Sequence, residues 1–257
     1  MLMLGSLTRG HDWGGDFSAY IMQADSLHEG SIGAFMEANR QAVEESSRRM
    51  FPVAYPWGFP LLLAPVFAVA GLNPIVLKSV CVAAYLLFLA ILVPVFRHAH
   101  STPWLLCLIG LFAFNPLLLR YADLILSDLP FLAVSTLCLL QIRRITVPGT
   151  SRTSAVRDAV ITGALIAAAY TIRTNGLLLL VALGLSQIIA RMQCRCSAAP
   201  DRAGTQAAAP GTAIPAAGAH AELPLLRPLI PHLAAVALIA MYHAAFQIGR
   251  ASCRERV

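Results

Sequence analysis

The residues best suited to chemistry in this chain are acids and one arginine that border apolar segments. Asp12 and Asp16 lie in a glycine-loosened polar segment near the start of the chain. Asp128 interrupts a long apolar region, and Arg173 ends another. A carboxylate can take the proton of an attacking hydroxyl, and the planar fork of arginine binds phosphate. The pattern therefore predicts chemistry on a phosphate-bearing lipid at a membrane face.

Asp128 is apolar on both sides in the sequence, and an ionisable residue at membrane depth is a functional hypothesis by default. The alternative is a helix cap. Ser127 or Asp128 could accept hydrogen bonds from the first free amides of a helix, with Pro130 close to the favoured first-turn position. The two roles are compatible, because a capping carboxylate can also face a cavity.

The other candidates also have structural alternatives. Asp16 precedes a short helical pattern and could only cap it, and Asp12 competes with it for the functional role. Arg173 could be an arginine that snorkels to the membrane interface. Asp123 could only be the ion partner of its neighbour Arg120.

The composition predicts an integral membrane protein. Of 257 residues, 58% are hydrophobic and only 12% are charged, and the mean hydropathy is +0.69. A soluble domain carries roughly a quarter charged residues. The net charge of +6 does not predict nucleic-acid binding, because the arginines punctuate apolar runs and do not cluster with aromatic residues.

The apolar runs predict an all-α, polytopic transmembrane bundle. We expect residues 1–74 to form an extracytoplasmic loop with short interfacial helices, at Ala19–Leu27, Ile32–Met50 and Leu61–Leu72, the first two broken at Gly30. Tyr55–Pro60 should interrupt any helix. Residues 75–192 should form the transmembrane core, 193–228 a flexible cytoplasmic linker, and 229–247 a further transmembrane helix. The six predicted spans are Ile75–Phe96, Pro103–Leu119, Leu129–Ile142, Ala159–Ile172, Gly176–Ile189 and Leu229–Phe246.

The basic residues predict the orientation. A hairpin broken at Arg173–Gly176 places the arginines between the other spans on one side, which the positive-inside rule makes cytoplasmic. The acidic loop, Asp128 and Arg173 then share the extracytoplasmic face. These arginines are Arg97, Arg143, Arg144, Arg152, Arg157, Arg191, Arg195, Arg202 and Arg227.

The cysteines and histidines do not predict a metal site. Cys194-Arg195-Cys196 lacks the spacing of a zinc site, and the histidines show no metal-ligand spacing.

Ile248–Val257 reads like a translated sequencing adapter, and Met1–Gly5 like the last turn of a truncated helix, so we expect a fragment of a longer protein.

Taken in order, four motifs resemble the membrane glycosyltransferases of the C-type fold, in the branch of protein mannosyltransferases and the lipid A aminoarabinose transferase. The resemblance covers roughly residues 10–190. In the first motif, Asp16 stands just before a loop helix that contains Tyr20. In the second, Tyr55–Pro60 runs into an apolar stretch that ends at Gly71. In the third and fourth, Ser127–Pro130 opens a later helix and Arg173–Gly176 forms a hairpin turn. Many members have two adjacent acids where this chain has Asp16-Phe17.

The resemblance implies transfer of a sugar from a polyprenyl-phosphate carrier to a lipid, glycan or protein acceptor outside the cytoplasm, in a bacterial inner membrane. It makes Asp16 the general base, and Asp128 a second carboxylate that orients the acceptor or holds a divalent metal. Arg173 would steady the phosphate leaving group. We expect Tyr20, Tyr55, Asp12 and Arg120 to contact substrate. The alternatives are a transporter or flippase-like protein that uses Asp128 and Arg173 as a substrate path, or an inactive fragment.

Overall fold

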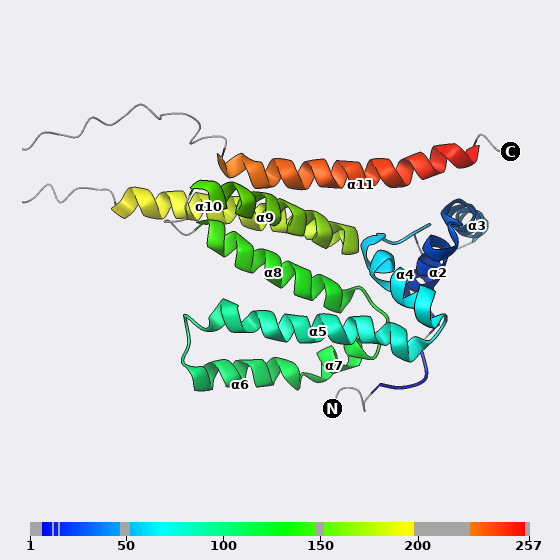
Figure 1. The fold of residues 1–257 in the computed structure, drawn as a ribbon, viewed down its shortest axis with the longest axis horizontal. Coiled ribbons are helices and arrows are strands. Elements are labelled where there is room, and N and C mark those ends of the chain that lie inside the picture. The colour runs from blue at the N-terminus through cyan, green and yellow to red at the C-terminus, as the bar shows by residue number, and fades with distance from the viewer. Residues whose placement is uncertain are drawn as a thin grey trace, which may run out of the picture.

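A computed structural model of the protein describes residues 7–11, 13–14, 16–46, 52–146, 152–197 and 227–254. Within these ranges the chain forms helices and connecting loops, and no strand (Figure 1). The all-α helical bundle predicted from the apolar runs is confirmed. The α-helices are α2 (Asp16–Glu29), α3 (Ile32–Glu45), α4 (Gly58–Ala70), α5 (Pro74–Phe96), α6 (Thr102–Ala113), α7 (Pro116–Ala122), α8 (Asp128–Thr146), α9 (Arg152–Ile172), α10 (Leu178–Ser197) and α11 (Ile230–Arg254). Short 3₁₀ helices are η1 (Thr174–Leu177) and η2 (Arg227–Leu229).

The long helices form a stack in which each helix packs on the next. The order is α6, α5, α8, α9 and α11, and α10 packs against α8 (Figure 1). The short helices α2, α3 and α4 gather at one end of this stack, and α4 packs against α2, α5 and α9. The acidic segment near the start of the chain is therefore held against one end of the long helices.

Three described helices are long and apolar enough to cross a membrane, namely α5, α8 and the segment Thr174–Gln193. The pair α6 and α7 would make a fourth crossing if the two count as one bent span. The protein is thus an integral membrane protein by helix length and composition. Two of the six predicted spans do not reach this standard among the described residues. The α9 helix is not among the qualifying helices, and Ile230–Phe246 is apolar but shorter.

The predicted span Pro103–Leu119 is not one continuous helix, because the chain bends by 55° between α6 and α7. The Asn115 side chain accepts hydrogen bonds from the amides of Leu117 and Leu118, at 2.9 and 3.3 Å, and so caps a new helix. Pro116 then occupies its first turn, where the missing N–H costs nothing. A residue before proline also avoids the helical region, so the sequence Asn115-Pro116 ends one helix and starts the next.

The expectation that Tyr55–Pro60 interrupts any helix is only half right. Residues 52–56 are irregular, but α4 already begins at Gly58 and includes Pro60. Proline is tolerated in a first helical turn, since the amides there have no intrahelical partner. The predicted helices Ala19–Leu27 and Ile32–Met50 also have different bounds, and Gly30 separates α2 from α3 with a φ of 69°.

The hairpin predicted at Arg173–Gly176 is confirmed, with η1 forming its turn. Halfway along α10, Gln187 donates to the carbonyl of Pro228, in η2 just before α11, over 3.0 Å. The end of α9 lies instead beside the later part of α11, where the Tyr170 hydroxyl contacts His243 Nε2 at 2.7 Å. The helices α9 and α10 therefore run in opposite directions.

The helix ends that carry the predicted cytoplasmic arginines lie together at one end of the stack, as the arginine pattern predicts. Arg143 donates to the carbonyl of Val95 over 2.8 Å, so the end of α8 lies beside the end of α5. The start of α9, the end of α10 and the start of α11 lie at that same end of the stack (Figure 1). The start of α8 and the end of α9 lie at the opposite end, beside α2 and α4.

Parts of the predicted domain layout lie outside the described residues. These are Met1–Gly5 and most of the linker, residues 198–226. The α10 helix extends to Ser197, so the segment 193–197 is helical and not linker. The α11 helix continues to Arg254, into the segment that reads like an adapter.

Candidate active site

Asp128 and Arg173 form an ion pair at the end of the bundle that carries α2 and α4. Asp128 is the first residue of α8, and Arg173 directly follows the last residue of α9. Arg173 Nη1 donates to Asp128 Oδ1, and the two side chains are 36% and 31% exposed. The partial positive charge at a helix start favours the carboxylate, and the partial negative charge at a helix end favours the guanidinium. The pair is therefore favoured by both helices and remains accessible to a ligand.

Two glycines let the chain approach the end of α9 closely enough to fix Arg173. A Cβ on Gly58 would lie 2.5 Å from the backbone carbon of Thr171, and a Cβ on Gly176 would lie 2.4 Å from the backbone nitrogen of Tyr170. Neither gap admits a methyl group. The start of α4 and the turn η1 thus pack closely against the last turn of α9, immediately before Arg173.

Tyr20 connects α2 to the start of α8. Its hydroxyl lies 3.0 Å from Ser127 Oγ, and the tyrosine is 3% exposed. Its ring contacts those of Tyr55 and Phe59, with centroid separations of 5.1 and 5.0 Å. Sequence reasoning treated Ser127 only as a helix cap. Its contact with Tyr20 also links α2, which begins with Asp16, to the start of α8.

Asp16 is the first residue of α2, and its Oδ1 accepts a hydrogen bond from the Tyr55 hydroxyl. The fully buried side chain of Gln23 fixes the Tyr55 backbone. Its Nε2 donates to the Tyr55 carbonyl over 2.9 Å, and its Oε1 accepts from the Tyr55 amide over 3.1 Å. Asp16, Tyr20 and Gln23 occur at helical spacing and share one face of α2.

The Tyr20 hydroxyl lies close enough to both acids and to the arginine for their charges to affect its pKa. Burial raises this pKa above its usual 10.0, and the hydrogen bond with Ser127 lowers it. Asp16 and Asp128 raise it further, whereas Arg173 lowers it. Burial and the hydrogen bond to Asp16 also raise the pKa of Tyr55. Both hydroxyls are therefore protonated at neutral pH.

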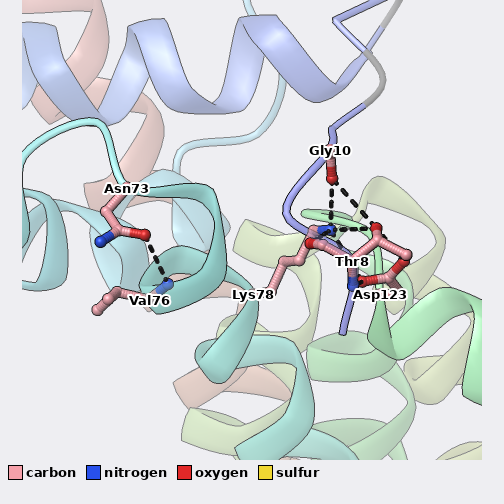
Figure 2. Close-up of polar contacts among 6 residues, drawn as sticks. All are labelled: Thr8, Gly10, Asn73, Val76, Lys78 and Asp123. Carbon is pink, nitrogen blue, oxygen red and sulfur yellow. Dashed lines mark hydrogen bonds and ion pairs between the residues drawn. The ribbon is translucent and has the colours of Figure 1, made fainter. Parts of the chain in front are cut away.

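A buried lysine anchors the segment that leads to Asp16. Figure 2 shows Lys78, from α5, pointing at the loop formed by residues 8–10. Its Nζ donates to the carbonyls of Thr8 and Gly10, over 2.8 and 2.7 Å, and pairs with Asp123 Oδ1 at 2.8 Å. Thr8 in turn donates from its amide and its hydroxyl to the Asp123 carboxylate, over 2.8 and 2.7 Å. We call Thr8, Gly10, Lys78 and Asp123 the lysine latch.

The latch corrects one sequence-based alternative. Asp123 pairs with Lys78 and not with its neighbour Arg120. Arg120 is exposed and makes no ion pair within the described part of the chain. Arg120, a predicted substrate contact, is therefore not brought into the group around Tyr20. Asp12, the competitor of Asp16, lies outside the described residues.

The arrangement bears on the two roles considered for Asp128. Its carboxylate is paired with Arg173, and in the described ranges no three His, Cys, Asp or Glu side chains group together as they would around a metal ion. Asp16 accepts from the Tyr55 hydroxyl and Asp128 pairs with Arg173, so the two acids hold a hydroxyl and a cationic side chain.

Sequence reasoning missed Gln23 and Lys78 as parts of this arrangement. Gln23 was recognisable, because it lies seven residues after Asp16 and so on the same helical face. Lys78 is a single lysine within an apolar span, and an intramembrane charge is expected to pair with another polar group. That partner, Asp123, is 45 residues away in the sequence, so only the folded structure identifies it.

Comparison with known proteins adds no relative: no family model, no curated protein and no solved structure matches this chain.

Proposed function

We propose that the protein is a glycosyltransferase that moves a sugar from a polyprenyl-phosphate carrier to an acceptor outside the cytoplasm. The observation that carries the proposal is the chain of contacts that brings Asp16, Asp128 and Arg173 together around Tyr20, at one end of a bundle with apolar helices of membrane-spanning length. A carboxylate can act as general base towards an acceptor hydroxyl, and a guanidinium can stabilise the charge that develops on a leaving phosphate.

In the proposed reaction the acceptor oxygen forms a bond to the anomeric carbon of the sugar, while the bond from that carbon to the phosphate oxygen breaks. Asp16 takes the proton of the acceptor hydroxyl as general base. The departing polyprenyl phosphate keeps the electron pair of the broken bond. The transfer is balanced without any further reactant.

Arg173 stabilises the leaving phosphate, because negative charge grows there as the glycosidic bond breaks. In the free protein Arg173 is held by Asp128. A phosphate can share the guanidinium, which carries five donors in a planar fork. Asp128 thus sets the direction of Arg173, and Tyr20 and Ser127 tie this pair to the helix that begins with Asp16.

The distribution of charge supports the proposed membrane orientation. The arginine-rich helix ends would lie in the cytoplasm and the Asp16–Arg173 end outside it. A polyprenyl-phosphate donor and an extracytoplasmic site are those of an envelope enzyme in a bacterial inner membrane. The donor supplies its own activated phosphate, so the reaction needs no nucleotide.

The test is a donor-cleavage assay with the purified full chain in liposomes. The donors are synthetic polyprenyl-phosphate mannose, glucose and aminoarabinose, each mixed with a bacterial envelope extract as acceptor, and the released polyprenyl phosphate is measured by mass spectrometry. Asp16→Asn should lower release by at least about 100-fold, the usual size of a general-base contribution, with an unchanged melting temperature. Asp25→Asn, which changes another acid of the same helix, is the control and should retain release.

Equal release by wild type and Asp16→Asn would overturn the proposal. Movement of intact donor across the liposome membrane, without cleavage, would favour the transporter alternative. Absence of both activities from the folded wild type, with all three donors, would favour the inactive fragment.

A further inference from the structure

An open cleft of about 500 Å³ lies beside the candidate site, where α11 passes the end of α9 and α3 (Figure 1). Six ring-bearing side chains line it, namely Tyr55, Trp57, Tyr170, Tyr242, His243 and Phe246. Among the described residues that line the cleft, none is Asp, Glu, Lys or Arg. We infer that this cleft binds the acceptor, and that the acceptor is an uncharged saccharide. This inference rests on the proposed function.

The position of the cleft connects it to the reacting groups. Tyr55 lines the cleft, and its hydroxyl donates to Asp16, the proposed base. Thr174 also lines the cleft and directly follows Arg173. A molecule in the cleft can therefore reach the space between the base and the group that holds the phosphate. The acceptor must lie there, because its hydroxyl loses its proton to Asp16.

The rings of the cleft are held in a fixed arrangement. Trp57 and Phe246 stack with a centroid separation of 5.1 Å and an interplanar angle of 8°. The Trp57 amide donates to the Tyr242 hydroxyl over 2.8 Å, and the Tyr170 hydroxyl contacts His243 Nε2 at 2.7 Å. These bonds join α11 to the end of α9 and to the start of α4. The cleft is therefore preformed, which lowers the entropic cost of binding.

The chemistry of the lining favours a sugar over other acceptors. The apolar faces of pyranose rings pack on aromatic rings, and the tyrosine hydroxyls and the imidazole can exchange hydrogen bonds with sugar hydroxyls. A phosphorylated or acidic acceptor would call for lysine or arginine, which the described lining lacks. The carrier lipid chain is long and wholly apolar, and it belongs beside the spanning helices α5 and α8. The described lining of the cleft instead comes from α3, residues 52–57, the end of α9, η1 and α11, and includes no residue of α5 or α8.

The test is binding of the detergent-purified full chain to an array of neutral, phosphorylated and uronic-acid-containing oligosaccharides. Binding should be confined to neutral saccharides. His243→Ala should weaken it by about five- to tenfold, the equivalent of one hydrogen bond, and His243→Glu should weaken it further. His243 is exposed, so both variants should fold. His98→Glu, which changes an exposed histidine at the opposite end of the bundle, is the matched control and should bind as wild type.

The result separates this inference from the proposed function. Donor cleavage that depends on Asp16, together with binding of charged glycans only or of no saccharide, overturns the inference and leaves the glycosyltransferase standing. Binding of neutral saccharides that is lost in His243→Glu, without any donor cleavage, supports the saccharide cleft and overturns the enzyme. Equal binding by wild type, His243→Glu and His98→Glu would place the saccharide elsewhere and overturn the inference.

Discussion

Asp128 and Arg173 join the start of α8 to the end of α9, so that one ion pair closes the end of an antiparallel helix pair. The two residues are 45 positions apart and belong to different sequence motifs. Their meeting gives each a partner that neither motif indicated. It also makes Asp128 more than a helix cap, since its carboxylate holds the residue that we assign to the phosphate.

Reversing this ion pair should separate its structural role from its role in the reaction. Because both side chains are about one third exposed, we expect Arg173→Ala to lower the free energy of unfolding by less than about 1 kcal/mol. The double variant Asp128→Arg, Arg173→Asp should recover only part of that loss, because the reversed charges oppose the partial charges of both helix ends. It should not recover donor cleavage, because the guanidinium then extends from the other helix. Recovery of cleavage in the double variant would assign the pair a purely structural role.

Gln23 should matter for stability through the backbone of Tyr55. Replacing it with Leu leaves the Tyr55 amide and carbonyl without their partner in a part-buried setting. We expect a cost of about 2 kcal/mol, the usual penalty for unpaired buried groups, measured by chemical denaturation in detergent. Met22→Leu, at an exposed neighbour of Gln23, is the control and should be neutral. A neutral Gln23→Leu would show that the loop is held by other contacts.

The close approach at the end of α9 predicts different costs for glycine substitutions. Gly58→Ala should lower the melting temperature markedly and weaken donor cleavage, because its Cβ would meet the Thr171 backbone at 2.5 Å. Gly184→Ala, in open space on α10, should be neutral or raise stability by up to about 1 kcal/mol, since alanine favours helix. Equal melting temperatures for the two variants would contradict the tight packing of α4 on α9.

The lysine latch should open in acid. Burial raises the pKa of Asp123, but hydrogen bonds from Lys78 and Thr8 outweigh this effect, and the pKa falls below its usual 3.8. A lowered carboxylate pKa contributes stability that is present above the unfolded value and is lost as the pH falls through the folded value. We therefore expect no release of residues 8–10 between pH 7 and 5, and release below 3.8.

Hydrogen exchange at the Thr8 amide, which donates to Asp123, is the measurement. Asp123→Asn keeps an acceptor for this amide but cannot titrate, so it should remove the acid transition. At neutral pH, Lys78→Met should cost about 3 kcal/mol of stability, the size expected when one partner of a buried ion pair is lost. An acid transition that persists in Asp123→Asn would assign it to another group.

The spacing of residues within one segment determined much of this protein. The long continuous apolar runs indicated helices, since a helix pairs all of its backbone groups within one segment in lipid. The break at Gly30, the hairpin at Arg173–Gly176 and the helix start at Asp128 all follow from local chemistry, in which glycine, proline and polar side chains end helices. Asn115-Pro116 carried a comparable signal, and the bend between α6 and α7 follows from it.

Which residues meet was decided by the tertiary structure. Lys78 with Asp123, Arg173 with Asp128 and Tyr20 with Ser127 are 45, 45 and 107 residues apart. Helical spacing relates side chains only a few turns apart, so it does not indicate such partners. The physical reason is packing. The positions of these groups are set by the close packing of Gly58 and Gly176 against α9 and by the packing of α2 against α4. Both depend on surfaces that form only when the helices assemble.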